Sequence, residues 1–176
     1  MLIARQRSPF SAFTYDLVDQ AGQAIGALSW PDFAVARNAR LKSLVPKSFT
    51  TSIRLTCQGQ AYEVAFEYLT RDWANDIRFV LTAGGDVLAS ADAIHPSKRI
   101  ARPRITLTQP ASAELVRIGG LFSIRYALQS SGQTLGVVFE KPGLRLRRTL
   151  VAELPDSLTL PVQCFMVFLV LNFGYR

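Results

Sequence analysis

The chain has 176 residues, of which 49% are hydrophobic and 19% are charged, and this composition excludes a disordered or a collagen-like protein. Its length is that of one domain, which buries roughly 70% of its unfolded surface and needs no disulfide or metal to fold. Two cysteines and one histidine exclude a four-ligand Cys/His zinc site, an iron–sulfur cluster and a disulfide-rich secreted scaffold.

The net charge of +7 is concentrated in one part of the chain. Residues 97–148 contain ten Lys and Arg against two acids, a net charge of +8. Sixteen of the twenty cations are Arg, whose planar guanidinium is suited to phosphate. Two interpretations stay open: a surface that binds an anionic partner, or a compositional excess that only serves solubility.

The chain start has charge but no apolar core of signal-peptide length, which disfavours secretion and predicts a cytoplasmic protein. The most apolar stretch, residues 158–173, covers about 24 Å as a helix. A membrane-spanning helix needs about 20 apolar residues to cross about 30 Å of hydrocarbon. A tail anchor nevertheless stays open as an alternative.

Polar and apolar residues alternate along most of the chain, which is typical of antiparallel strands with one buried side. Turns that contain glycine, such as those at Gly22, Gly84 and Gly132, separate the alternating segments. The pattern predicts about a dozen strands, near residues 11–18, 23–30, 35–44, 48–57, 60–69, 76–82, 86–91, 103–109, 113–118, 121–128, 134–140 and 144–152. An antiparallel sheet of that size is expected to close into a barrel, because closure removes the exposed edges.

The alternation ends before the last segment, where the sequence predicts a helix over residues 158–173. Asp156 or Ser157 is the expected cap, Pro161 is tolerated in the first turn, and Gly174 follows the end. Because this helix is apolar on every side it must be buried on every side, and the barrel interior is the place that offers this. The competing interpretation is a buried central strand, since Val and Phe favour strands.

A short sequence occurs twice in the chain. Residues 22–26, Gly-Gln-Ala-Ile-Gly, resemble residues 132–136, Gly-Gln-Thr-Leu-Gly, and each follows an aromatic-rich strand. The two segments are explained by a duplication, or by one turn design used twice.

About a dozen short strands followed by one apolar C-terminal helix resemble the tubby-like superfamily, which includes tubby C-terminal domains, plant LURP-one-related proteins and phospholipid scramblases. The likeness lies in residues 13–26, 122–136 and 144–173. It implies a closed barrel around the final helix, and binding of phosphoinositide head groups by neighbouring basic residues. The acidic calcium-binding segment of scramblases is reduced here to Glu153 and Asp156, too few for the six to eight oxygen ligands of calcium.

Candidate catalytic residues are few. His95 lies in Ala-Ile-His-Pro-Ser, a predicted surface loop without a recognised nucleophile turn or a Gly-x-Ser-x-Gly motif. Cys57 and Cys164 are interpreted as small core residues, and glycine-rich nucleotide loops are absent from the sequence. We therefore predict no catalytic residue, no metal, no cofactor and no nucleic-acid partner. An enzyme of unrecognised type that uses His95 stays an alternative.

The basic residues are the sharpest functional feature. Arg102 and Arg104 share one face of a predicted strand, and Arg145 and Arg147 share one face of another. If these strands lie close together, they form a cationic patch for anionic head groups; otherwise they are two solvated faces whose charges prevent aggregation. Arg148 is in phase with Leu144, Leu146 and Leu150 on the face predicted to be buried, which predicts a bulge or a side chain that reaches the barrel mouth. The candidate anion-binding residues are Lys98, Arg99, Arg102, Arg104, Arg145, Arg147 and Arg148.

The sequence thus predicts one mainly-β domain over residues 1–176, a closed antiparallel barrel of about 12 strands around a C-terminal helix. The expected function is non-enzymatic binding of an anionic membrane surface, a phosphoinositide-like head group or a protein partner through the basic face. Such a protein is cytoplasmic and peripheral to the membrane. The alternative is a scramblase-like or tail-anchored protein whose final helix inserts into lipid.

Overall fold

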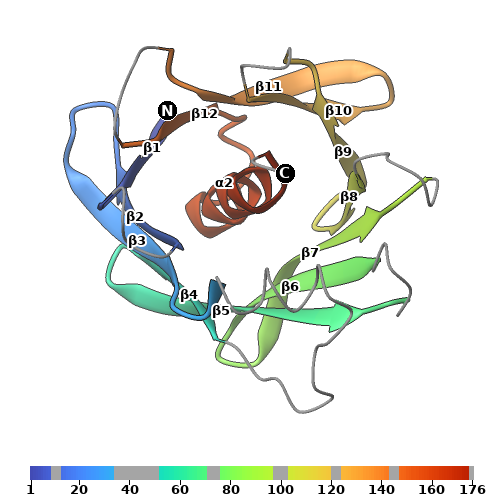
Figure 1. The fold of residues 1–176 in the computed structure, drawn as a ribbon, viewed down its shortest axis with the longest axis horizontal. Helices are drawn as coiled ribbons and strands as arrows, with labels where there is room; N and C mark the ends of the chain where they lie inside the picture. The colour runs from blue at the N-terminus through green and yellow to red at the C-terminus, as the bar shows by residue number, and fades with distance from the viewer. Residues whose placement is uncertain are drawn as a thin grey trace.

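The computed structural model describes residues 1–8, 13–33, 52–70, 76–96, 103–119, 124–142 and 147–174. Twelve antiparallel strands form a closed barrel in which each strand pairs with its neighbours in the chain, and β1 pairs with β12 to complete the ring (Figure 1). The helix α2 (Leu160–Gly174) lies along the interior. The predicted closed barrel around a C-terminal helix is confirmed. The strands are β1 (Leu2–Gln6), β2 (Phe13–Val18), β3 (Ala24–Trp30), β4 (Ile53–Cys57), β5 (Gln60–Tyr68), β6 (Ile77–Ala83), β7 (Asp86–Ile94), β8 (Arg104–Gln109), β9 (Ala113–Arg117), β10 (Arg125–Ser130), β11 (Gln133–Glu140) and β12 (Thr149–Glu153).

The strand predictions differ from the structure at the two ends of the chain. β1 was not predicted, because an alternation of five residues is too short to be recognised. In the structure Leu2 and Ala4 of this strand are buried, and β1 pairs with β2 on one side and with β12 on the other. β12 begins at Thr149, so Arg147 and Arg148 of the predicted strand 144–152 precede it, and residues 144–146 lie outside the described residues. The predicted strand near 35–44 lies outside the described residues.

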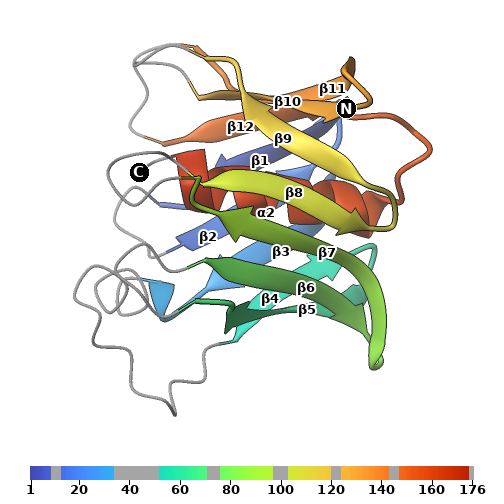
Figure 2. The same cartoon turned by 90° about the vertical axis from the view of Figure 1, so that its right-hand side faces the viewer.

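The barrel has two ends, which we call the entry rim, where α2 begins, and the exit rim, where α2 ends (Figure 2). At the entry rim, residues 154–159 lead from β12 into Leu160, and the other strand connections are the short segments 19–23, 58–59, 84–85, 110–112 and 131–132. At the exit rim the helix ends at Gly174, whose carbonyl oxygen accepts a hydrogen bond of 3.5 Å from Arg117 Nη1. A cation at the carboxyl end of a helix satisfies a free carbonyl and interacts favourably with the helix dipole.

The core consists of α2 and the inward side chains of all the strands. Every residue from Cys164 to Gly174 is buried. The ring of Phe168 lies 5.5 Å from that of Phe79 and 5.8 Å from that of Phe13, both edge to face, a favourable arrangement for aromatic pairs. A helix with no polar side needs an apolar surface all round, and the barrel provides it.

The start of the helix differs in detail from the prediction. Gln163 donates its backbone N–H to the carbonyl of Thr159 at 3.0 Å, so the residue before the helix is Thr159 and not Asp156 or Ser157. Gln163 also donates its side-chain amide to the carbonyl of Leu158 at 2.9 Å. Pro161 is in the first turn as predicted. Backbone N–H groups in the first turn have no hydrogen-bond acceptor within the helix, so proline is tolerated there.

The repeated sequence corresponds to a repeated structure at the entry rim. Gly22 and Gly132 have φ angles of 84° and 79° in their turns, and in each hairpin the strand register shifts just before the turn. Such bulges bend a strand and help a sheet to close. The second glycine of each segment, Gly26 or Gly136, lies against the backbone of the next strand. An added Cβ would be 1.9 Å from the carbonyl oxygen of Thr56 or 2.5 Å from that of Glu153.

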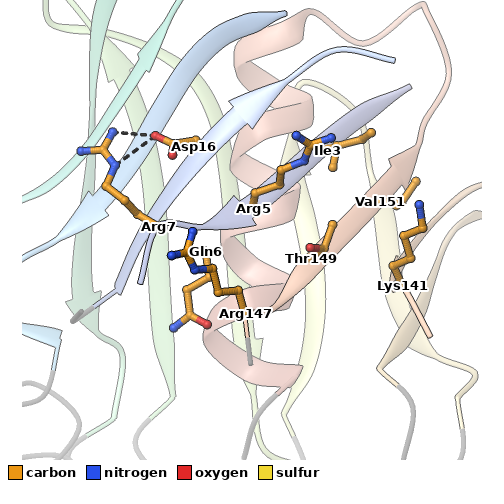
Figure 3. Close-up of a pocket in the computed structure, with 9 residues that line it drawn as sticks. All are labelled: Ile3, Arg5, Gln6, Arg7, Asp16, Lys141, Arg147, Thr149 and Val151. Atoms are coloured by element: carbon orange, nitrogen blue, oxygen red, sulfur yellow. Dashed lines mark hydrogen bonds and ion pairs between the residues drawn. The ribbon is translucent and has the colours of Figure 1, made fainter. Parts of the chain in front are cut away.

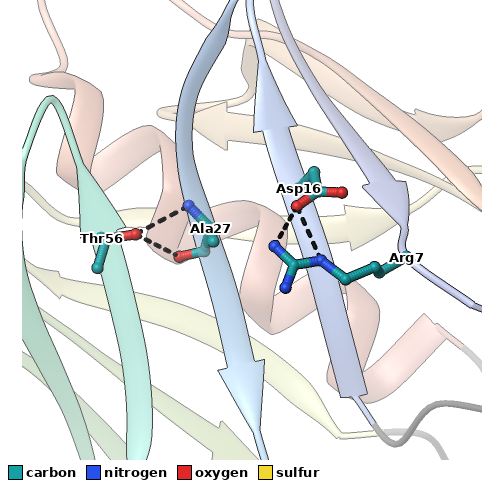
Figure 4. A network of polar contacts seen from close by, with 4 residues as sticks. All are labelled: Arg7, Asp16, Ala27 and Thr56. Carbon is teal, nitrogen blue, oxygen red and sulfur yellow. Dashed lines mark hydrogen bonds and ion pairs between the residues drawn. The ribbon is translucent and has the colours of Figure 1, made fainter.

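At Gly26 the close approach is accompanied by a side-chain bridge between β3 and β4 (Figure 4). The Thr56 hydroxyl accepts a hydrogen bond from the Ala27 N–H at 3.0 Å and lies 3.4 Å from the Ala27 carbonyl oxygen, to which it donates. These hydrogen bonds join β3 and β4 at the place where the backbone of β4 lies too close to residue 26 for any side chain.

Gly26→Ala is therefore expected to destabilise the barrel by about 3 kcal/mol, because two backbones must separate. Gly22→Ala places alanine in a left-handed turn with open space around it and is expected to lose about 1–2 kcal/mol. Chemical denaturation of both variants measures the difference. Equal losses would show that the strands do not approach closely at Gly26.

Removal of the helix is the more drastic test. A chain that ends at Leu158 loses the apolar filling of the barrel, and the inward side chains of the strands then face a large void. We expect this variant to lose cooperative thermal unfolding and to be recovered in the insoluble fraction. A folded barrel without α2, as a membrane-anchor helix predicts, would contradict the buried position of the helix.

Candidate functional site

The structure places three of the seven predicted anion-binding residues. Arg104 begins β8, whereas Arg147 and Arg148 directly precede β12, and β9, β10 and β11 lie between. Arg104 and Arg147 are thus not on neighbouring strands. Arg104 Nε also donates to Glu114 Oε1 at 2.6 Å, so its charge is partly neutralised. Lys98, Arg99, Arg102 and Arg145 lie outside the described residues.

Arg148 is at the barrel mouth. It is exposed, precedes β12 and binds Gln6 through its backbone, since its N–H donates to Gln6 Oε1 at 3.2 Å and its carbonyl accepts from the Gln6 N–H at 2.8 Å. The predicted alternatives were a bulge or a side chain at the mouth, and the exposed position at the exit rim agrees with the second. Its positive charge acts on Tyr15, whose pKa it lowers against the effect of burial.

A groove on the outer face of the barrel gathers Arg147 with other cations (Figure 3). It has a volume of about 280 Å³ and lies over β1, β2 and β12 beside the exit rim. It crosses the seam where the first and last strands pair. The lining residues are Ile3, Arg5, Gln6, Arg7, Asp16, Lys141, Arg147, Thr149 and Val151.

The cations of this groove differ in their partners. Arg7 donates from Nε to Asp16 Oδ1 at 3.1 Å and pairs with it through a second nitrogen (Figure 4), and this hydrogen bond, then the charge of Asp16, raises the pKa of Arg7. Within the described part of the chain, the side chains of Arg5, Lys141 and Arg147 have no hydrogen bond or ion pair. Three cations line one groove, and each can donate hydrogen bonds to an anion.

The floor of the groove is apolar. Ile3 and Val151 point outward, because their strand neighbours point into the core, and they are direct partners across the β1–β12 pair. Val151 is only 6% exposed. On the other side of Val151 its partner on β11 is Phe139, and the Arg125 guanidinium lies over that ring at 5.6 Å. A cationic edge around an apolar floor suits an anion that carries an apolar chain.

The groove belongs to a wider separation of charge along the barrel axis. Every Lys and Arg that the structure describes lies at the exit rim or within the last two residues of a strand there. The fully described connections of the entry rim contain neither Lys nor Arg, and Asp19, Asp86, Glu153 and Asp156 lie in or beside them. The described cations are thus concentrated at the exit rim, whereas acids occur at both ends, with Asp32, Glu67, Asp76 and Glu140 at or near the exit rim.

Arg5, Arg7 and Lys141 were missed as site residues. Arg5 is on β1, which was not predicted, Arg7 directly follows that strand, and Lys141 was counted only in the basic segment of residues 97–148. The alternation of Leu2 and Ala4 with Ile3 and Arg5 was the available signal. The sequence alone does not show that β1 lies beside β12. This neighbourhood arises because the barrel closes.

Other charged residues of the exit half form pairs. Arg78 binds Asp92 through two bonds, Nε to Oδ1 at 2.7 Å and Nη2 to Oδ2 at 2.9 Å. His95 was predicted as a surface residue, but its side chain is only 15% exposed. Its backbone N–H donates to Asp76 Oδ1 at 2.8 Å, and its ring Nδ1 lies 3.3 Å from the same oxygen. Asp76 thereby draws the ring inward and ties the end of β7 to the start of β6.

No protein-family model, curated protein or solved structure matches this chain. The resemblance to the tubby-like superfamily therefore stays a prediction. Among the described residues, no group of three or more His, Cys, Asp or Glu is placed to hold a metal ion. In that same part of the chain, no helix is both long and apolar enough to cross a bilayer.

Tyr15, inside the mouth beneath Arg148, provides a pH test of this end of the barrel. Burial raises the pKa of Tyr15 to about 12, Arg148 opposes this and Glu140 adds to it, whereas the pKa in the unfolded chain is about 10. The folded state thus keeps a proton that the unfolded state loses, so stability falls as the pH rises from 10 to 12. The loss is about 2–3 kcal/mol.

Tyr15→Phe keeps the ring and removes the titration, so its unfolding free energy should fall less than that of the wild type above pH 10. Denaturant titrations from neutral to alkaline pH measure this difference. Parallel losses in the two proteins would mean that Tyr15 ionises freely in the folded state.

Proposed function

We propose that the protein is a non-enzymatic binding protein that attaches to anionic phospholipid head groups through the groove of Arg5, Lys141 and Arg147. The observation that carries this proposal is the gathering of three cations, without ion-pair partners in the described chain, over the apolar floor of Ile3 and Val151. The phosphate and its neighbouring oxygens bind the cations, and the first methylenes of the lipid contact the floor.

The charge separation along the axis supports this function. An anionic surface attracts the exit rim and repels the acidic entry rim, so the barrel approaches with the groove toward the lipid. The protein then acts at the cytoplasmic membrane surface without insertion. The proposal includes membership of the tubby-like superfamily, whose layout of a barrel around a terminal helix is the layout of this chain.

The experiment is co-sedimentation with phosphatidylcholine vesicles, with and without phosphatidylserine or a phosphatidylinositol phosphate. The test variant is Arg5→Gln/Lys141→Gln/Arg147→Gln. The control variant Arg54→Gln/Arg104→Gln/Arg125→Gln removes the same charge from strand positions outside the groove. At about 1 kcal/mol for each cation near an anionic surface, the test variant should bind roughly 100-fold more weakly, and the control much less so.

The outcomes separate three explanations. Binding that ignores lipid charge would exclude head-group recognition and leave a protein partner as the use of this face. Equal losses in both variants would show that net charge, and not the groove, determines binding. Binding that weakens with added salt is expected, since exposed charges are screened.

The alternative function, a scramblase-like or tail-anchored protein, requires α2 to leave the barrel and enter lipid. The enclosed position of the helix gives that alternative no support. The helix-removal variant described above distinguishes the two functions.

A further inference from the structure

The groove that carries the proposed function also contains one carboxylate. Asp16 lines it together with the cations, and its side chain is 43% exposed. Asp16 on β2 lies directly across from Arg5 on β1, and Arg5 lies across from Thr149 on β12. In Figure 3, Arg7 and Asp16 are on one side of the groove, and Thr149 and Lys141 are on the other. The groove therefore has a hydrogen-bond acceptor at its β2 side and unpaired cations at its centre and its β12 side.

The ion pair of Asp16 uses only one of its two carboxylate oxygens. Two nitrogens of Arg7, Nε and Nη2, both donate to Oδ1. In the pair of Arg78 and Asp92, by contrast, each nitrogen binds an oxygen of its own. Asp16 Oδ2 has no hydrogen-bond donor among the residues that the structure describes. Since an ionised carboxylate accepts hydrogen bonds on both oxygens, Oδ2 is available to a ligand in the groove.

The β12 side of the groove offers donors instead. The Thr149 carbonyl accepts a hydrogen bond of 2.8 Å from the Lys141 N–H, which joins the two residues, and Arg147 lies two positions before Thr149. The Thr149 hydroxyl has no hydrogen-bond partner in the described part of the chain. A ligand that satisfies both sides has anionic oxygens for the donors and a cationic donor for Asp16.

We propose that the groove selects head groups that carry an ammonium beside their anionic oxygens, as serine phospholipids do. This inference rests on the proposed function and names its class of lipid. The phosphate and the serine carboxylate accept from Arg5, Lys141 and Arg147, and the ammonium donates to Asp16 Oδ2. Charge-assisted hydrogen bonds are roughly twice as strong as neutral ones, so a hydroxyl in place of the ammonium binds Asp16 less well. The Asp16 carboxylate also repels a head group that has only negative charge.

The test compares phosphatidylcholine vesicles that contain equal fractions of either phosphatidylserine or phosphatidylglycerol. The two anionic lipids have the same net charge, but phosphatidylglycerol has hydroxyls where phosphatidylserine has an ammonium and a carboxylate. The wild type should bind the phosphatidylserine vesicles roughly threefold more tightly, which is the size of effect that one exposed ion pair produces. Co-sedimentation over a range of lipid concentrations measures both affinities.

The test variant Asp16→Asn keeps the shape of the side chain and removes its charge. It should lose the preference for phosphatidylserine and bind phosphatidylglycerol more tightly than the wild type does, because no carboxylate then repels the phosphate. Glu114→Gln is the matched control. Glu114 Oε1 accepts from Arg104 Nε at 2.6 Å outside the groove, so this variant also releases one arginine and makes the same change in net charge. It should keep the wild-type preference.

Three results would overturn the inference: equal binding of the wild type to the two kinds of vesicle, a preference that survives in Asp16→Asn, or a preference lost in Glu114→Gln as well. The proposed function survives all three, since it requires only that anionic vesicles bind through the groove. Absence of binding to either kind of vesicle would overturn both. Asp16→Ser, which also removes the charge, replaces Asp16→Asn if that variant fails to fold.

Discussion

The enclosure of α2 is the constraint on which the rest of the structure depends. A helix that is apolar on all sides has no stable surface in water, and a ring of twelve strands has an interior too wide for its own side chains to fill. Each therefore requires the other. Phe168 illustrates this dependence, because its ring contacts rings from β2, β3 and β6 as well as from its own helix. The hydrophobic effect thus couples the last element of the chain to nearly every strand before it.

The sequence predicts the features that depend on local pattern. The hairpins were found because Gly22 and Gly132 mark turns between alternating segments, and the helix was found because its pattern lacks alternation. β1 was missed because five residues carry too short a pattern. The site was found only in part, through Arg147. Arg5 and Arg147 come from opposite ends of the chain and meet because the barrel closes between β1 and β12, and no local pattern contains that information.

The two rims illustrate how the strand connections allow this division of charge. The entry rim needs tight turns, which favour glycine, aspartate and serine because these residues adopt or stabilise turn geometry. Asp19 is an example: its side chain accepts a hydrogen bond from the Gln23 N–H at 2.8 Å, next to the left-handed Gly22. Asp19 thus stabilises its turn at the entry rim, whereas all the described Lys and Arg residues lie at the exit rim, beside the groove.

The position of the groove at the closing seam also links binding to stability. Arg5 is on β1, whereas Lys141 and Arg147 flank the chain segment that leads into β12. Only the closed barrel brings these three residues together in one groove. An anion that contacts all three would therefore bind the folded state alone and stabilise it by mass action.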